Sequence, residues 1–250
     1  MLAALLELAP AGVEQVDGDG YVEYAIYGVP GELPALPEGE AEVAGVRVRV
    51  SGEEVAADWA ERWKRFHEPV LVGGRLFVRP PWTEPRPDTL DLVIDPGQAF
   101  GTGGHPTTRL CLELLLGLEP RDSLADLGCG SGVLAIAAAK LGFAPVIAFD
   151  SEPAALDATR ANARANDVEL DRVERLNLRD QPPPLAATLI ANLAGPLLRR
   201  VAQLLVERPD ALIVSGLLDQ EADEVAAAFR PLRERRRLSE RGWSALLVSG

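Results

Sequence analysis

The stretch Asp126–Gly132, which reads Asp-Leu-Gly-Cys-Gly-Ser-Gly, constrains the fold of this chain more than any other. The apolar residues 124–125 precede it, and the alanine-rich residues 133–141 that follow are strong helix formers. Glycine permits a tight turn and a close approach of the backbone to a ligand at the amino end of a helix. The stretch therefore predicts a strand, a ligand-binding turn and a helix, although a glycine-rich turn that binds nothing has the same pattern.

The spacing of the glycines narrows the class of ligand. Gly128, Gly130 and Gly132 form a GxGxG pattern, whereas the dinucleotide fingerprint requires glycine at the next position, where this chain has Val133. This difference disfavours an enzyme that uses a nicotinamide cofactor. Other cofactors that contain a nucleotide or nucleoside remain possible ligands of this turn.

From residue 124 to the end of the chain, predicted strands and helices alternate. The strands after the glycine turn cover residues 146–150, 172–176, 187–191 and 211–215, the helices cover 154–166, 197–206 and 219–229, and a hairpin of 232–240 and 243–249 ends the chain. This order predicts an α/β fold, the class I methyltransferase variant of the doubly wound, Rossmann-like sheet with a C-terminal antiparallel hairpin. Asp150 ends its strand where a ribose-binding carboxylate belongs in a βαβ nucleotide unit.

The chain before this sheet has a different composition. We expect a small α+β domain in residues 1–54, with a short helix near residues 2–8 and strands at Tyr21–Tyr27 and Val43–Val50. Residues 55–69 have apolar side chains at helical spacing and predict a linker helix. Residues 70–250 then form the large domain, which begins with a hairpin of 70–72 and 76–78 around two glycines.

A long loop leads into the glycine turn. Residues 95–108 contain four glycines and two prolines, a composition that excludes regular structure and is typical of a functional loop. Thr107 or Thr108 is predicted to cap the helix that follows.

Charge and cysteine content restrict the class of partner. The chain has 25 Lys and Arg against 38 Asp and Glu, a net charge of −13 that disfavours binding to DNA or to anionic membranes and favours basic protein partners. Two cysteines and two histidines supply neither a disulfide framework nor the ligand spacing of a zinc site. No apolar run reaches the length of a membrane span. We expect a soluble, cytoplasmic monomer that holds no metal.

Several stretches resemble one family, the ribosomal protein L-eleven methyltransferases, known as PrmA. The resemblance rests on residues 58–59, 63–64, 80–82, 126–137 and 191–192, and above all on the Asp95–Thr108 segment. It implies an enzyme that transfers methyl groups from S-adenosyl-L-methionine to amino groups, lysine side chains or the N-terminal amine, of a large-subunit ribosomal protein. It also implies that residues 1–54 are a shortened form of the ferredoxin-like domain that binds the substrate.

The resemblance implies cofactor contacts at Thr108, Gly128, Asp150 and Asn192. The chemistry of the residues agrees, because a carboxylate at position 150 offers acceptors to two ribose hydroxyls. Gly130, with Gly128, lets the backbone close on the methionyl end of the cofactor.

Two further residues, and a second role for Asn192, complete the expected site. Asp126 is expected to favour the cofactor's ammonium group. The side-chain carbonyl of Asn192 is the expected catalytic group, since it can hold an amine hydrogen and keep the lone pair aimed. Phe100 is either a wall near the methyl group or the adenine, or a packing residue of its loop.

No general base is evident. His105 lies in the right loop, and a structural hydrogen bond between loop turns is the competing interpretation. His67 and Cys111 are interpreted as structural. Two alternative functions stay open: a class I methyltransferase that acts on another protein or a small amine, and a cofactor-binding protein that has lost transfer.

Overall fold

The structure is a computed structural model that describes residues 14–18, 21–25, 39–43, 45–52, 67–96, 101, 103–120 and 122–250. The chain divides into two compact units, Met1–Trp63 and Lys64–Gly250, which are described here separately. The helix predicted near residues 2–8, most of the predicted linker helix and Phe100 lie outside the described residues.

The first unit contains two antiparallel pairs of strands. One pair joins β1 (Glu14–Gly18) to β2 (Tyr21–Ala25), and the other joins β3 (Gly39–Val43) to β4 (Val46–Val50). The strand predicted over Val43–Val50 is confirmed from Val46 to Val50, but its start is wrong, because Val43 belongs to the preceding strand. Gly45, with φ of +76°, reverses the chain inside that stretch.

The second unit begins with a three-stranded sheet. The predicted hairpin is confirmed as β5 (Val70–Val72) and β6 (Leu76–Arg79), and β7 (Leu90–Val93) pairs with β6 in parallel. Gly73 and Gly74 take φ of +55° and +69°, left-handed conformations that glycine adopts readily, in the three-residue turn 73–75 between the strands.

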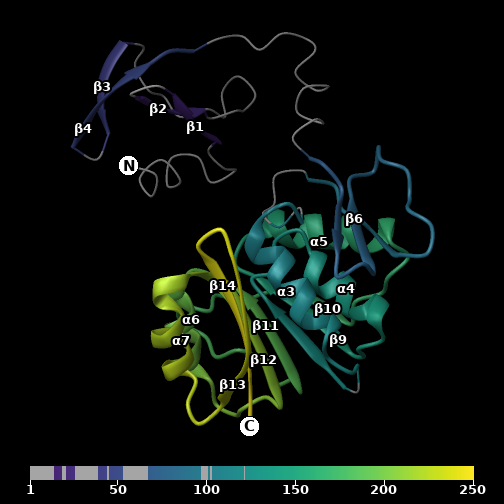
Figure 1. Ribbon diagram of the computed structural model, residues 1–250. Coiled ribbons are helices and arrows are strands. Elements are labelled where there is room, and N and C mark those ends of the chain that lie inside the picture. The colour runs from purple at the N-terminus through teal and green to yellow at the C-terminus, as the bar shows by residue number, and fades with distance from the viewer. Residues whose placement is uncertain are drawn as a thin grey trace. The chain divides into compact units, whose positions relative to one another are not determined.

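A seven-stranded sheet forms the centre of the second unit (Figure 1). Its strands are β8 (Leu124–Leu127), β9 (Val146–Asp150), β10 (Arg172–Arg175), β11 (Thr188–Asn192), β12 (Ala211–Leu218), β13 (Arg233–Glu240) and β14 (Trp243–Ser249). They lie in the order β10-β9-β8-β11-β12-β14-β13, in which β14 runs antiparallel to both of its neighbours and β8 to β12 run parallel. The predicted α/β alternation and the closing hairpin are confirmed.

Helices cover both faces of this sheet. They are α3 (Pro106–Leu116), α4 (Val133–Leu141), α5 (Pro153–Ala165), α6 (Gly195–Leu204) and α7 (Ala222–Ala228), the last preceded by the short 3₁₀ helix η1 (Asp219–Glu221). Alternate residues of a strand point to opposite layers: Ile190 joins the core of α3, α4 and α5, whereas Leu189 and Ala191 join that of α6 and α7. Both faces are buried, which explains why the parallel strands read as continuous apolar runs.

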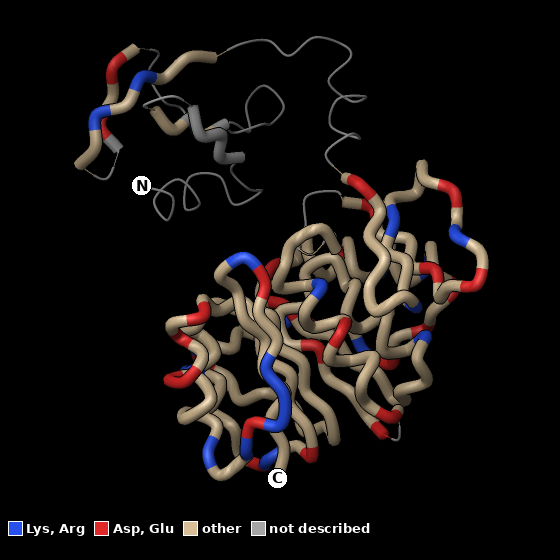
Figure 2. Tube along the Cα trace, in the orientation of Figure 1, with Lys and Arg blue, Asp and Glu red and all other residues tan. Residues whose placement is uncertain are grey.

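The strand β13 forms one edge of the sheet and is rich in arginine. Arg233, Arg235, Arg236 and Arg237 lie on it, and Figure 2 shows this run of basic residues along the strand. Most of its side chains are exposed, and its pairing with β14 shifts register between Glu234 and Arg236.

A glycine in β12 allows two backbone segments to touch beside the end of β11. Gly216 has φ of +85° and lies at the register shift between Ser215 and Leu217. A Cβ atom added there would lie 2.5 Å from the carbonyl oxygen of Leu193. The segment that follows Asn192 therefore depends on the absence of a side chain at position 216.

We expect Gly216→Ala to lower the free energy of unfolding by about 2–4 kcal/mol, because a left-handed alanine and an overpacked contact each cost about 1–2 kcal/mol. Gly242→Ala is the matched control, since Gly242 has φ of +82° and nothing within 4 Å of the added atom. That control is expected to lose about 1 kcal/mol. Denaturant titrations of both variants test the difference, and equal losses would contradict the role of the Leu193 contact.

Candidate functional site

The carboxyl ends of three neighbouring strands bring most of the predicted site residues together. The chain leaves β8 toward β9 on one side and later returns to β11 on the other, and open α/β sheets bind their ligands outside the strand ends at such a switch point. Asp126 lies in β8, Asp150 ends β9 and Asn192 ends β11. The glycine turn, residues 128–132, follows β8 directly.

The glycine turn has the conformation that its sequence predicts. Gly128, Gly130 and Gly132 all take positive φ, at +78°, +53° and +81°. The amides of Gly128 and Cys129 donate to the carbonyl oxygen of Phe149 at 2.8 and 2.9 Å, which fixes the turn to β9. A Cβ at position 132 would lie 2.8 Å from the Thr159 side chain, so this position has no room for one.

Asp150 closes the turn from the neighbouring strand. Its Oδ2 accepts the amide of Gly130 at 3.0 Å, and its Oδ1 accepts the amide of Glu152 at 3.0 Å. The residue is partly exposed. Because a carboxylate has about four lone-pair sites, two backbone donors leave acceptor capacity for two hydroxyl groups.

Asp126 is fully buried next to the glycine turn, and only one of its two carboxylate oxygens has a hydrogen bond. Its Oδ2 accepts the amide of Ala135, in the first turn of α4, at 3.1 Å, while its Oδ1 has no hydrogen-bond partner. Burial, with a smaller contribution from the charge of Asp150, raises the pKa of Asp126 to about 7. A cationic ligand group beside Oδ1 would satisfy this atom and favour the ionised carboxylate.

The raised pKa of Asp126 predicts how stability depends on pH. Between the ordinary aspartate pKa of about 3.9 and a folded pKa of about 7, the folded protein holds a proton that the unfolded chain has lost. The free energy of unfolding therefore falls as pH rises through this window. Asp126→Asn removes the titrating group, so wild type should lose stability relative to this variant between pH 5 and 8. Denaturant titrations across that range measure it, and a constant difference would contradict the assignment.

Asn192 carries the second unsatisfied oxygen. Its Nδ2 donates to Oγ1 of the buried Thr108 at 3.4 Å, and its Oδ1 is buried without a partner. Within the part of the chain that the structure describes, Asp126 Oδ1 and Asn192 Oδ1 are the buried side-chain polar atoms left without a hydrogen bond. Such atoms are costly unless a ligand satisfies them.

The Asp95–Thr108 loop is attached to this site at its described positions. Ser131 Oγ donates to the carbonyl oxygen of Gly101 at 2.7 Å, and Arg109 donates to that of Gly104 at 2.6 Å. Arg109 also forms an ion pair with Glu240 in the C-terminal hairpin. Phe100 lies outside the described residues of this loop, so its role stays a prediction.

The cap of α3 differs from the prediction. His105 caps the helix in place of Thr107 or Thr108: its Nδ1 lies 3.4 Å from the amide and 2.8 Å from Oγ1 of Thr107. Its ring also packs edge-on against Trp243 at 5.1 Å. Burial, and then the charge of Arg109, lowers the pKa of His105. These contacts support the structural interpretation of His105.

Neither buried thiol is suited to nucleophilic chemistry. Burial raises the pKa of both Cys111 and Cys129, so both stay protonated. The described residues contain no cluster of three or more His, Cys, Asp or Glu side chains that could hold a metal ion. None of the helices described is long and apolar enough to cross a membrane.

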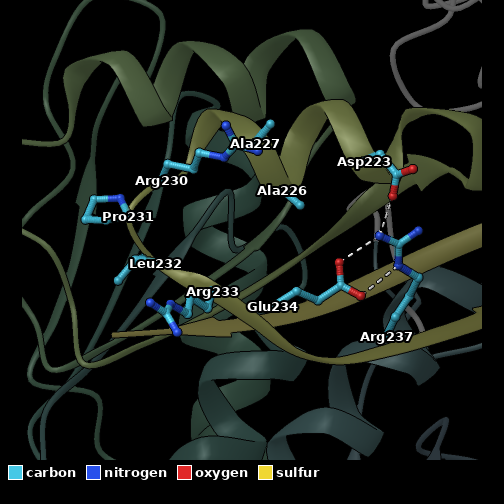
Figure 3. A pocket seen from close by; sticks show the side chains of 9 residues that line it. All are labelled: Asp223, Ala226, Ala227, Arg230, Pro231, Leu232, Arg233, Glu234 and Arg237. Atoms are coloured by element: carbon cyan, nitrogen blue, oxygen red, sulfur yellow. Dashed lines mark hydrogen bonds and ion pairs between the residues drawn. The ribbon is translucent and has the colours of Figure 1, made fainter.

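Two hollows lie apart from the predicted site residues. The larger, about 590 Å³, lies between α7 and the start of β13, where Arg237 pairs with Asp223 and Glu234 (Figure 3). Arg233 in its lining stands in register, across β14, with the first residue of β12. The smaller, about 280 Å³, is lined by residues that precede β8, β11 and β12. None of the predicted site residues lines either hollow.

Sequence reasoning missed the residues that hold the turn from behind. The backbone around the glycine turn and β7 forms hydrogen bonds with Thr159 and Asn162 on α5 and with Asn166, the C-cap residue of that helix. The available signal was the presence of polar residues at helical spacing on an otherwise alanine-rich buried face.

The strand order, the inserted antiparallel β14 and the glycine turn after β8 define a class I methyltransferase fold. A crystal structure of ribosomal protein L11 methylase from Lactobacillus delbrueckii subsp. bulgaricus shares this fold, with a TM-score of 0.66 over 74% of this chain and 98% of that chain at 24% identity. The family model of ribosomal protein L11 methyltransferase (PrmA) matches residues 37–249. The chain therefore belongs to this family, which confirms the resemblance.

Curated relatives agree with this assignment. Ribosomal protein L11 methyltransferase of Shewanella sediminis is 47% identical over 179 residues, which cover 69% of this chain and 60% of the relative. The protein of the same name from Pseudomonas syringae pv. tomato is 43% identical over 177 residues, or 69% of this chain and 61% of the relative. The chain thus spans about three fifths of the length of the curated relatives it matches.

Proposed function

We propose that the protein transfers methyl groups from S-adenosylmethionine to amino groups of ribosomal protein L11. Membership of the family supports this function, and the observation that carries it is the pair of unsatisfied buried oxygens, on Asp126 and Asn192, at the carboxyl edge of the sheet. The residues present fit the cofactor, since they offer an anion for its ammonium group and acceptors for its ribose. The net charge of −13 favours a basic substrate.

When bound, S-adenosylmethionine supplies a methyl group on a positively charged sulfur. The side chains would divide its recognition between them. Asp126 would hold the ammonium group, the Gly128–Gly130 backbone would lie against the methionyl end, and Asp150 would accept the two ribose hydroxyls. Thr108 would act through Asn192, because its Oγ1 accepts a hydrogen bond from Nδ2 of Asn192 at 3.4 Å.

Asn192 would position the acceptor amine. In the transfer a nitrogen–carbon bond forms as the sulfur–carbon bond breaks, and the bonding electron pair stays on sulfur, which becomes neutral. The amine must enter without its extra proton so that its lone pair is available. Asn192 Oδ1 would accept one amine hydrogen and align that lone pair with the methyl group, and alignment of this kind lowers a barrier by up to ~7–11 kcal/mol.

Incubation with labelled S-adenosylmethionine and a ribosomal protein extract tests the proposal. We expect one labelled protein, identified as L11 by mass spectrometry, and no label on small amines added in excess. Label on another protein or on the small amine would show that this molecule, and not L11, is the substrate. Binding of the cofactor without any label would favour a binding protein that has lost transfer.

We also propose that the first unit recognises the substrate protein. Residues 1–54 stand where the family resemblance places the substrate-binding domain, and the family match begins within them at residue 37. Competition for L11 methylation by the separately added first unit is not a suitable assay, because that unit has not been shown to fold alone. Charge reversal at exposed Glu40 and Glu42 in the full chain, which replaces acidic groups that would attract a basic substrate, is the better test. A higher KM for L11 with an unchanged KM for the cofactor would support this role.

A further inference from the structure

One face of α5 holds the backbone of two loops at once. Thr159, Asn162 and Asn166 lie three and four positions apart, so they share a face of the helix. All three are at least 94% buried, with exposed fractions of 0%, 2% and 6%. Buried amides and hydroxyls are retained at such positions only when hydrogen bonds satisfy them. Most of their partners are backbone groups of the glycine turn, of β7 and of Asp95 just after it, and Thr159 also donates to Sγ of Cys129 at 3.2 Å.

Asn162 joins the glycine turn to the start of the Asp95–Thr108 loop. Its Nδ2 donates to the carbonyl oxygen of Ser131 at 2.9 Å, and its Oδ1 accepts the amide of Asp95 at 3.0 Å. One planar carboxamide thus sets the distance between the turn that follows β8 and the loop that follows β7. Ser131 provides a second link through its hydrogen bond to Gly101.

Asn166 makes a similar number of hydrogen bonds but does not reach the glycine turn. Its Oδ1 accepts the amide of Val93 at 2.9 Å, and its Nδ2 donates to the carbonyl oxygens of Val93 at 2.6 Å and Asn162 at 2.8 Å. It therefore pairs with both polar groups of one β7 residue, as a neighbouring strand would. The chain offers two buried asparagines on one helix, of which one contacts the turn and the other does not.

We propose that Asn162 is a positioning residue for the cofactor, which acts through the backbone of Ser131 and Asp95. The inference rests on the proposed function, in which the glycine turn lies against S-adenosylmethionine. Ser131 stands between Gly130 and Gly132, so a shift of its carbonyl moves the turn itself. Loss of the Asn162 bridge separates the turn from the loop and weakens cofactor binding, while the sheet and the helix stay in place.

The test compares Asn162→Asp with Asn166→Asp. Each variant keeps an acceptor for its backbone amide partner but places a second acceptor where an N–H group had donated to a carbonyl oxygen. Both should lower the melting temperature to a similar extent. Calorimetric titration with S-adenosylhomocysteine should show a Kd raised at least 10-fold in Asn162→Asp and less than 3-fold in Asn166→Asp.

The outcomes separate this inference from the proposed function. A wild-type protein that does not bind S-adenosylhomocysteine overturns the proposed function, and this inference with it. Wild-type binding with an unchanged Kd in Asn162→Asp, or with equal changes in both variants, overturns the positioning role alone. If either aspartate variant does not fold, Asn162→Thr and Asn166→Thr are compared in the same titration. A larger rise in Kd for Asn162→Thr than for Asn166→Thr supports the positioning role, and an unchanged Kd or equal changes overturn it.

Discussion

Replacing Asp150 with alanine is expected to raise the Kd for S-adenosylmethionine by at least about 100-fold, because each hydrogen bond to a charged group contributes about 1.5–3 kcal/mol. In the proposed complex this carboxylate accepts two ribose hydroxyls. It also holds the amides of Gly130 and Glu152, so its removal loosens the turn as well. Isothermal titration calorimetry measures the change.

Glu152→Ala is the control for charge alone. Glu152 lies two residues further on, is exposed, and makes no side-chain cap on α5, so its loss removes one negative charge without removing a contact. We expect its Kd to change less than about 2-fold, since exposed charges are well screened. If the Kd for the cofactor rose equally in both variants, the loss of a negative charge would explain the effect. An unaltered Kd in Asp150→Ala would reject the ribose contact.

Asn192→Ala is expected to reduce kcat by about 100-fold, the loss that a misplacement of about 1 Å produces at a reacting centre. The carboxamide oxygen is buried and without a partner, and the nitrogen is directed toward Thr108. Alanine retains neither group, so the acceptor amine loses its alignment. Single-turnover methylation with saturating cofactor isolates this step from binding.

Two further variants identify which atom of Asn192 acts. Asn192→Asp keeps an acceptor oxygen and should retain part of the rate. Thr108→Val removes the hydroxyl that accepts from Nδ2 and leaves the carboxamide less firmly oriented, so an intermediate loss is expected. Unchanged turnover in Asn192→Ala with the cofactor bound would refute the positioning of the amine.

The sequence predicted the large sheet well because its pattern is local. The parallel strands other than β10 are short apolar runs, a helix follows each of them within a few residues except before the closing hairpin, where η1 comes first, and the glycine turn marks the first strand. The strand order also predicts that Asp126, Asp150 and Asn192 lie at the same edge of the sheet, because the carboxyl ends of parallel strands meet there.

The predictions that failed depended on single residues or on distant contacts. Gly45 turned an alternating stretch into a hairpin, since alternation alone does not mark where a strand reverses. His105 took the cap that threonine normally provides, because its ring is held against Trp243 from the far end of the chain. The bridge made by Asn162 spans 67 positions to Asp95, and no local pattern encodes it.

The arginine-rich edge strand has a consequence for the protein in concentrated solution. An exposed edge presents unpaired backbone groups that can recruit a strand from another molecule, and charged side chains and bulges oppose such pairing. On β13 four arginines and a register shift at Arg235 lie together on that edge. A second molecule that paired with this edge would have to cover these charged side chains and follow an irregular register. The arrangement therefore protects the sheet against intermolecular pairing and aggregation.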